Sequence, residues 1–274
     1  MISTREHLAG ARRVVVKVGS SSISGENAHR IEAIVEALAA AHGRGTEVVL
    51  VSSGAIATGM PYLALEERPN DLATQQAAAA VGQNVLIYRY QAALRPFAIV
   101  AGQVLLTAGD LENDTHRSNA RRAMERLLAL RILPIVNEND TVATHEIRFG
   151  DNDRLAALVA RLIGADALIL LSDIETLFTR PPDEPGARPI DEVEYGDDLH
   201  GFEFGSVVVN SVGTGGAATK VSAARLASES GIGVLVTSAD RVEDALTGAH
   251  VGTWFSPNPD VIPTSATGSV RTRA

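Results

Sequence analysis

The sequence contains no cysteine among its 274 residues, which excludes disulfide bonds, thiolate metal sites and cysteine nucleophiles. Aromatic residues are also scarce, at 4% against 45% hydrophobic residues in total, so an aliphatic core is expected. No apolar run approaches the roughly 18 residues that a membrane helix needs. The first apolar run is short and carries Lys17, which is not typical of a signal peptide. We therefore predict a cytoplasmic protein without a membrane partner.

Positive charge is in short supply as well. Lys and Arg number 24 against 33 Asp and Glu, which gives a formal net charge of −9. This balance argues against the broad basic surface of nucleic-acid-binding proteins, and we expect no nucleic-acid partner. An anionic substrate would have to be attracted by a local group of positive charges, because the molecule as a whole repels it.

Short aliphatic runs alternate with segments of helical periodicity. Strands are predicted at 13–19, 47–51, 97–106, 132–136, 165–172 and 233–238, and those at 13–19, 47–51 and 165–172 are expected to be buried. Helices are predicted around 31–38, 71–94, 116–130, 155–162 and 218–230. The alternation predicts right-handed crossovers and a largely parallel sheet. Pro134 donates no ladder hydrogen bond, which favours an edge strand or a strand start, and 179–205 is typical of loops with a hairpin.

Small polar residues follow the predicted strands. The stretches "KVGSS", "VSSGA", "VNEND" and "LLSDIE" each stand at a strand exit. In a parallel sheet, ligands bind beyond the carboxyl ends of the strands. The sequence therefore predicts a ligand site at that edge.

A glycine-rich stretch, "SVGTGGAATKVSAARLA" at 211–227, leads into Lys220 and a predicted helix. It is not a Walker loop, because Lys220 is followed by Val221 instead of Ser or Thr. The glycines permit close backbone approach, and their amides, the helix N-terminus and Lys220 would favour an anion. An ordinary surface loop before a capped helix explains the same residues equally well.

Charged groups inside an apolar run or at the start of a predicted helix are the next candidates for functional residues. Lys17 lies inside "VVVKVG" and needs a carboxylate or a bound phosphate, unless it is an edge residue whose ammonium reaches water. Asp151, Asn152 and Asp153 begin the helix that carries Leu155. Helix capping accounts for one of these three residues, so the others are candidates for chemistry.

Six stretches together resemble a known family. They are "VVVKVGSSSI", "VSSGAIATG", "AAVGQ", "VNENDTVATHEIRFGDNDRLAALVA", "LLSDIETLF" and "GTGGAATKVSAA", in that order and over about residues 12–256. They closely resemble the glutamate 5-kinases, a group within the amino acid kinase family. The resemblance implies a three-layer α/β/α sandwich with a central, mainly parallel sheet. It also implies ATP-dependent phosphorylation of the side-chain carboxylate of L-glutamate to L-glutamyl 5-phosphate, which begins proline biosynthesis.

The resemblance implies a role for particular residues. The catalytic set would be Lys17, Lys220 and Asp153, with Asp153 holding the two lysines in position. Glutamate would be held by Ser53, Gly54, Asp140 and Asn152, where Asp140 suits the α-ammonium and Ser53 and Asn152 donate to carboxylates. ATP would contact Lys17, Gly19, Ser20, Ser172, Asp173, Thr214, Gly215, Gly216, Ala217, Ala218, Thr219 and Lys220. Mg²⁺ is the expected cofactor beside ATP, and no protein ligand is assigned to it.

The resemblance also sets expectations for organisation and partners. We expect an N-terminal extension at 1–11, a kinase domain at 12–256 and a disordered tail at 257–274, without the C-terminal PUA domain that many relatives carry. A homo-oligomer, dimer or tetramer, and feedback inhibition by proline are typical of the family. Two alternatives stay open at this point. One is a kinase of the same fold acting on acetylglutamate, aspartate, carbamate or uridylate, and the other is a non-catalytic sensor of nucleotide or amino acid.

Overall fold

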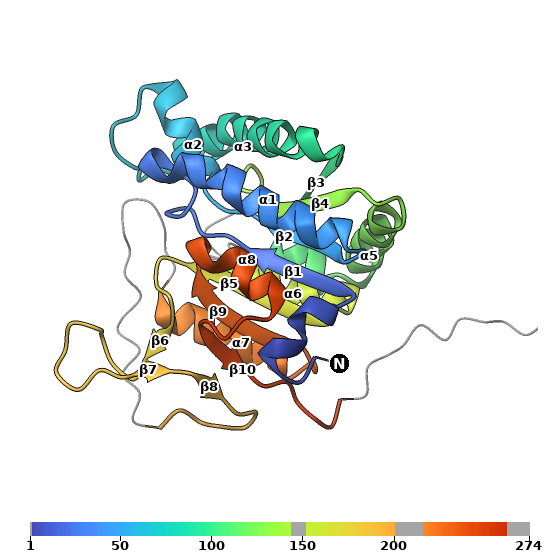
Figure 1. Cartoon of the computed structure of the whole chain (residues 1–274). Coiled ribbons are helices and arrows are strands. Elements are labelled where there is room, and N and C mark those ends of the chain that lie inside the picture. The colour runs from blue at the N-terminus through green and yellow to red at the C-terminus, as the bar shows by residue number, and fades with distance from the viewer. Residues whose placement is uncertain (1, 144–151, 201–215, 262–274) are drawn as a thin grey trace, which may run out of the picture.

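A single large sheet organises the molecule (Figure 1). The computed structural model describes residues 2–143, 152–200 and 216–261. Eight strands lie in the order β3-β4-β2-β1-β5-β9-β10-β8. They are β1 Arg13–Lys17, β2 Glu47–Val51, β3 Ala101–Leu106, β4 Leu133–Glu138, β5 Ala167–Ser172, β8 Glu192–Val193, β9 Gly233–Ser238 and β10 Thr253–Phe255. The six strands from β3 to β9 in this order are parallel, whereas β10 is antiparallel to β9. The largely parallel sheet is confirmed.

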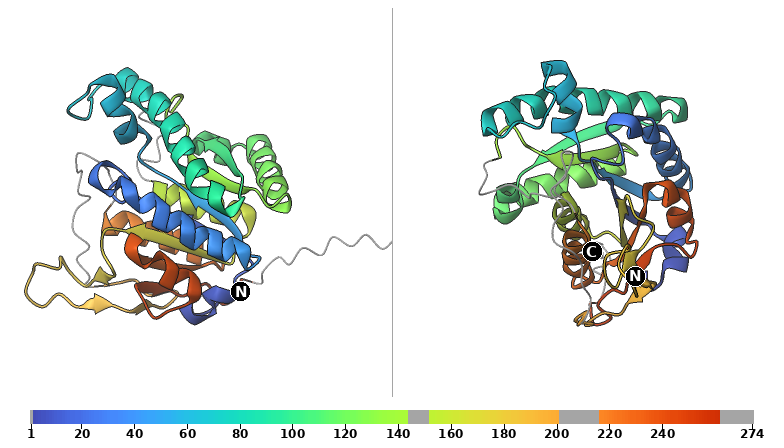
Figure 2. Two further views of the ribbon diagram at one scale, coloured as in Figure 1. Left: turned by 45° about the horizontal axis from the view of Figure 1, so that its top comes forward. Right: turned by 90° about the vertical axis from the view of Figure 1, so that its left-hand side faces the viewer.

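Helices cover both faces of the sheet (Figures 1 and 2). Successive side chains of a strand point to opposite faces. Val14 and Val16 of β1 therefore join the cluster that includes residues of α1, α3 and α8, whereas Val15 joins the cluster of α5, α6 and α7. The bounds are α1 Arg30–Gly43, α3 Leu72–Leu94, α5 Asp114–Ala129, α6 Asn152–Ile163, α7 Ala217–Ser228 and α8 Val242–Thr247. The arrangement is the predicted three-layer sandwich.

Short elements fill the connections. They are η1 Arg5–Gly10, η2 Gly25–His29, α2 Ala55–Gly59, η3 Met60–Leu63, η4 Arg95–Phe97, α4 Ala108–Glu112, β6 Leu177–Phe178, β7 Pro189–Ile190 and η5 Ala239–Arg241. Strands β6 and β7 pair antiparallel. Strand β7 lies within 179–205, where a hairpin was expected, whereas β6 precedes that range. Of the expected C-terminal tail, 262–274 lies outside the described residues, as do 144–151 and 201–215.

The expected N-terminal extension packs against the body of the protein. Ile2, Leu8 and Ala11 are buried in the same cluster as α1 and α8. The guanidinium of Arg5, a residue that is 3% exposed, donates to the carbonyl oxygens of Val251 at 3.2 Å and Gly252 at 3.1 Å. The extension is therefore held by both apolar and polar contacts.

Pro134 lies in an interior strand, because β4 is flanked by β3 and β2. The edge-strand alternative is thus wrong, and the strand-start alternative holds. The register of β4 with β2 begins at Ile135, one residue beyond Pro134. The missing N–H of the proline consequently falls before that ladder begins.

Two glycines let helices α2 and α3 cross with their backbones in contact. A Cβ atom on Gly59 would lie 1.9 Å from the carbonyl oxygen of Ala78, and one on Gly82 would lie 1.8 Å from that of Ala55. Both positions therefore require glycine. Because α2 follows directly after β2, this crossing fixes α3 relative to the carboxyl end of the sheet.

Candidate active site

The polar motifs predicted to meet at one edge do so. Strands β1, β2, β4 and β5 are neighbours and parallel, so their carboxyl ends lie at the same edge of the sheet. Lys17 is the last residue of β1, Ser172 the last of β5, and Ser53 follows β2. The strand exits at which the sequence predicted a ligand site therefore lie together at this edge of the sheet.

Lys17 has a carboxylate partner in the layer formed by α6 and α7. Like Val15, it stands at an odd-numbered position of β1, and such positions face these two helices. The ammonium of Lys17 forms an ion pair with Oδ1 of Asp153 on α6. Because Lys17 is 2% exposed, the solvent-exposed edge lysine considered from the sequence is wrong.

Lys220 reaches the same carboxylate from α7. Its Nζ lies 3.0 Å from Oδ2 of Asp153, so each carboxylate oxygen has one ammonium. Asp153 is fully buried and Lys220 is 7% exposed. Two ammoniums and one carboxylate therefore meet in a place of low water access, where their interactions with the charges of a ligand are strong.

The start of α7 completes this side of the site. Thr219 accepts a hydrogen bond from the N–H of Gly216 at 3.1 Å, and its hydroxyl lies 3.4 Å from Oδ2 of Asp153. Ala217 and Ala218 are half-buried in the first turn. Thr214 and Gly215, the other expected ATP contacts of this loop, lie outside the described residues.

The loops after β1 and β5 are joined by serine hydroxyls. Asp173, just after β5, accepts hydrogen bonds from Ser21 at 2.5 Å and from Ser22 at 3.1 Å. Gly19 and Ser20 precede these serines and are half-buried, as is Ser172. The expected ATP contacts of the two loops are therefore adjacent in space.

Gly54 brings the β2 exit against the β1 exit. Its φ is +88°, which L side chains rarely adopt, and a Cβ atom there would lie 3.4 Å from Cα of Ser20. Ser53, directly before it, is 8% exposed. The substrate-binding and ATP-binding residues predicted at these two exits thus lie side by side.

Asn152 is tied to two strands by its side-chain amide. Its Nδ2 donates to the carbonyl of Ser52 at 2.7 Å and to Oδ1 of Asn137 at 2.8 Å. Both amide hydrogens are then engaged, which leaves the oxygen Oδ1 for a ligand. The sequence interpretation had Asn152 donating to a carboxylate. The structure instead leaves it as an acceptor, which suits an ammonium.

Asp140 lies in the turn after β4 and is half-buried. Since β4 is the neighbour of β2, this turn is at the same edge of the sheet as Ser53. The expected substrate-binding residues therefore come from adjacent strand exits and from the first residue of α6.

Three side chains of this edge were not singled out from the sequence. Asn137, in "VNEND", donates from Nδ2 to Oε1 of Gln83 at 2.7 Å. The buried hydroxyl of Tyr90 lies 3.0 Å from Oγ of Ser52, and burial raises the pKa of Tyr90, which keeps it protonated. Gln83 and Asn137 lie in motifs that the sequence analysis quoted. The sequence around Tyr90 contains no pattern that would have indicated a role at this site.

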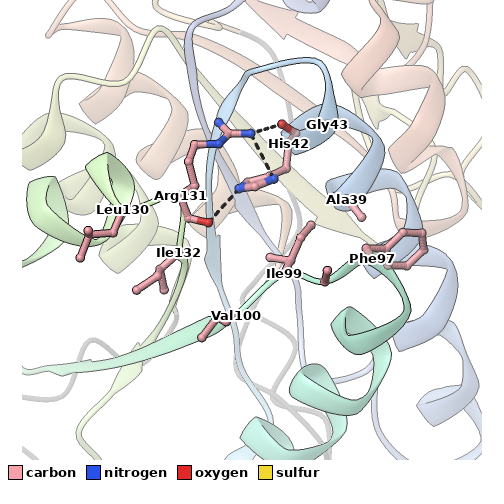
Figure 3. A pocket seen from close by; sticks show the side chains of 10 residues that line it. Ala39, His42, Gly43, Phe97, Ile99, Val100, Leu130, Arg131 and Ile132 are labelled. Carbon is pink, nitrogen blue, oxygen red and sulfur yellow. Dashed lines mark hydrogen bonds between the residues drawn. The ribbon is translucent and has the colours of Figure 1, made fainter.

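A pocket of about 460 Å³ lies at the opposite edge of the sheet (Figure 3). It is lined by the end of α1 and by the residues that precede β3 and β4. His42 and Arg131 face each other there, with Nε2 of His42 3.1 Å from the carbonyl of Arg131. The Arg131 guanidinium also donates to backbone carbonyls of His42 and Gly45. This pair joins two connections of the fold and is remote from the lysine–aspartate cluster.

Two other kinds of feature are absent from the described residues. Within 2–143, 152–200 and 216–261, no group of three or more His, Cys, Asp or Glu side chains is arranged to hold a metal ion. None of the helices in these ranges is both long enough and apolar enough to cross a membrane.

The fold and the site define an α/β protein with a buried lysine–aspartate cluster beyond the carboxyl ends of its parallel strands. A family model described as "Amino acid kinase family" matches residues 12–238, and the chain belongs to this family. A carbamate kinase from Giardia lamblia, solved bound to AMP-PNP, superposes with a TM-score of 0.67 at 17% identity. That match covers 91% of this chain and 100% of that one. At this identity, the likeness concerns the fold alone.

Within the family, the chain groups with the glutamate 5-kinases. It is 71% identical over 255 residues to the glutamate 5-kinase of Clavibacter sepedonicus, covering 93% of this chain and 98% of that protein. It is 68% identical over 268 residues to that of Leifsonia xyli subsp. xyli, covering 98% and 99%. The glutamate 5-kinase of Salinispora arenicola is 54% identical over 259 residues, which are 93% of this chain and 70% of that longer protein.

Proposed function

We propose that this chain transfers the γ-phosphoryl group of ATP to the side-chain carboxylate of L-glutamate, forming L-glutamyl 5-phosphate for proline biosynthesis. The proposal is carried by the 71% identity to a glutamate 5-kinase over 93% of the chain. It is supported by a buried cluster of two lysines and one aspartate at the strand exits.

The chemistry needs charge neutralisation more than proton transfer. A glutamate carboxylate is already ionised at neutral pH, since its ordinary pKa is about 4.3. One of its oxygens attacks the γ-phosphorus, the new O–P bond forms, and the bond from phosphorus to the β,γ-bridging oxygen breaks, leaving ADP. No general base is required. The obstacle is the repulsion between two anions, which positioned cations reduce.

We assign this neutralisation to Lys17 and Lys220. Both ammoniums are held on Asp153, so their positions are set before substrate arrives. Lys17 would contact the transferred phosphoryl group from the β1 side, and Lys220 would contact the nucleotide phosphates from α7. Preorganised donors of this kind stabilise the developing charge without rearrangement in the transition state.

The remaining residues would orient the two substrates. Asp140 and Oδ1 of Asn152 suit the α-ammonium of glutamate, and the Ser53 hydroxyl suits a carboxylate. ATP would lie along Gly19, Ser20, Ser172 and Asp173 and the start of α7. When bound, Mg²⁺ would neutralise phosphate oxygens. The described residues offer no cluster of ligands for it. Mg²⁺ commonly takes phosphate oxygens and water as most of its ligands. Oligomerisation and inhibition by proline stay predictions.

The decisive experiment is an ATP-dependent hydroxamate assay with glutamate, aspartate and acetylglutamate compared side by side. We expect product with glutamate at a kcat/KM at least about 100-fold above that with the others, because the site is built to pair a free α-ammonium and a carboxylate at a set spacing. Equal or higher activity with acetylglutamate or aspartate would overturn the substrate assignment. Failure with all three would favour a binding protein on this fold.

Two substitutions separate the roles within the site. Replacing Lys220 by Ala should lower kcat by about 100-fold or more, because a charge at the transferring phosphates is lost. Asp140→Ala should instead raise the KM for glutamate. Steady-state kinetics would measure both. Arg225→Ala is the control for Lys220, since Arg225 is an exposed cation on the same helix. An unchanged kcat in the first variant, or an unchanged glutamate KM in the second, contradicts these roles.

A further inference from the structure

A chain of hydrogen bonds links helix α3 to the first residue of α6 through strand β4. Gln83 on α3 accepts from Asn137 at 2.7 Å, and Asn137 accepts from Asn152 at 2.8 Å. Asn152 in turn donates to the Ser52 carbonyl at the end of β2, at 2.7 Å. Four elements are thereby joined beside the proposed glutamate site.

Backbone groups identify which atom of each asparagine amide is the nitrogen and which is the oxygen. A carbonyl only accepts, so the atom of Asn152 that faces Ser52 must be Nδ2. A backbone N–H only donates, and the N–H of Glu138 lies 2.9 Å from Oδ1 of Asn137. Asn137 therefore presents Nδ2 to Gln83 and needs an acceptor there. The oxygen Oε1 of Gln83 is that acceptor.

The position of Gln83 is set by the helix crossing. Its neighbour Gly82 is the residue whose missing Cβ allows α3 to touch the backbone of α2. Tyr90, two turns further along α3, has its hydroxyl 3.0 Å from Oγ of Ser52. Helix α3 therefore contacts the β2 exit at one point and the β4 exit at another, and it cannot shift at one without disturbing the other.

We propose that Gln83 is a positioning residue for the amino-acid substrate: by holding Asn137, it keeps the amide of Asn152 turned so that its oxygen faces the α-ammonium. This inference rests on the proposed function. Without the acceptor on Gln83, Asn137 can rotate its amide, and Asn152 loses the partner that holds one of its two hydrogens. The contacts of Lys17 and Lys220 with Asp153, which we assign to the nucleotide side of the site, involve none of the side chains of this hydrogen-bond chain.

The test compares Gln83→Met, which keeps the size of the side chain but removes the acceptor, with wild type. We expect the glutamate KM to rise by about tenfold, the effect of one lost buried hydrogen bond, while the ATP KM stays within about twofold. Gln91→Met is the matched control. Gln91 lies on the same helix, but among the described residues its amide bonds only the backbone of Ile99 and Ala101. That variant should therefore leave both KM values unchanged.

A second measurement does not depend on catalysis. With ¹⁵N-asparagine labelling, the side-chain amide resonances of Asn137 and Asn152 should move in Gln83→Met and stay close to wild type in Gln83→Glu, which retains an oxygen acceptor. If wild type fails to phosphorylate glutamate, the proposed function fails, and these resonances still judge the positioning role. Unmoved resonances in Gln83→Met, or an equal rise of both KM values, would overturn the inference.

Discussion

Replacing Asp153 by Asn tests the central charge arrangement without changing the size of the side chain. In the wild type, one fully buried carboxylate holds two ammoniums that are 2% and 7% exposed. The substitution leaves two buried cations facing a neutral amide. Breaking a buried ion pair by removing one partner costs about 3–5 kcal/mol.

The expected loss is at the centre of that range, about 4 kcal/mol. It is not doubled by the second lysine, because Oδ1 of the new Asn can still accept from one ammonium and Lys220 is close enough to the surface to move. At this chain length, a loss of 4 kcal/mol lowers Tm by on the order of 10 °C. It is a large share of the 5–15 kcal/mol that typically stabilises a folded protein.

The assay is urea and thermal unfolding with and without a non-hydrolysable ATP analogue. The analogue should recover part of the loss beyond its effect on wild type, because its phosphates supply the missing anion. Glu125→Gln is the control: Glu125 and Arg121 form an exposed pair at 2.9 Å, and its loss should cost about 0.5 kcal/mol or less. If Asp153→Asn unfolds within about 1 kcal/mol of wild type, the two lysines do not depend on Asp153 and the reasoning is refuted.

Two further predictions concern stability. Gly82→Ala should cost about 3 kcal/mol or more, because its Cβ would overlap the Ala55 carbonyl oxygen at 1.8 Å. Gly43→Ala, with nothing within 4 Å, should stay within about 1 kcal/mol of wild type in the same urea titration. Burial, and then the nearby Arg131 guanidinium, lower the pKa of His42 below its ordinary 6.5, so the unfolded chain binds more protons there and stability should fall as pH drops below about 6.5. In a His42→Gln variant, the free energy of unfolding should fall less between pH 7.5 and pH 5.5 than in wild type. An equal fall in the two proteins would contradict this prediction.

Local sequence patterns were sufficient for most of the sheet and its helices. The predicted helix at 71–94 corresponds to α3, and the predicted strand at 233–238 coincides with β9. Periodicity is a local property, so these elements could be located from neighbouring residues. The short elements α2, α4, β8 and β10 were missed because segments of two to five residues carry too little periodic signal. Strands β8 and β10 gain their partners from distant parts of the chain, because β10 pairs with both β8 and β9.

Some features of the site were likewise predictable from the sequence, and others depend on tertiary contacts. The sequence indicated that Lys17 required an anionic partner, and the motif that contains Asp153 was recognised without coordinates. The orientation of Asn152 could not be predicted, because it depends on the Ser52 carbonyl and on Asn137, which reach it from other strands. Gln83 likewise gains its role only through the crossing of α2 and α3.

The amino-acid sequence by itself determined the order of strands and helices, the polar residues at the strand exits and the membership of a family of kinases. The meeting of Lys17 and Lys220 on the two oxygens of one carboxylate was decided by the tertiary structure. The physical reason is that side chains alternate between the two faces of a strand. The partners of the Lys17 side chain therefore depend on which helices cover its face of β1. Helices α6 and α7 pack together there, and no local pattern in the chain specifies that contact.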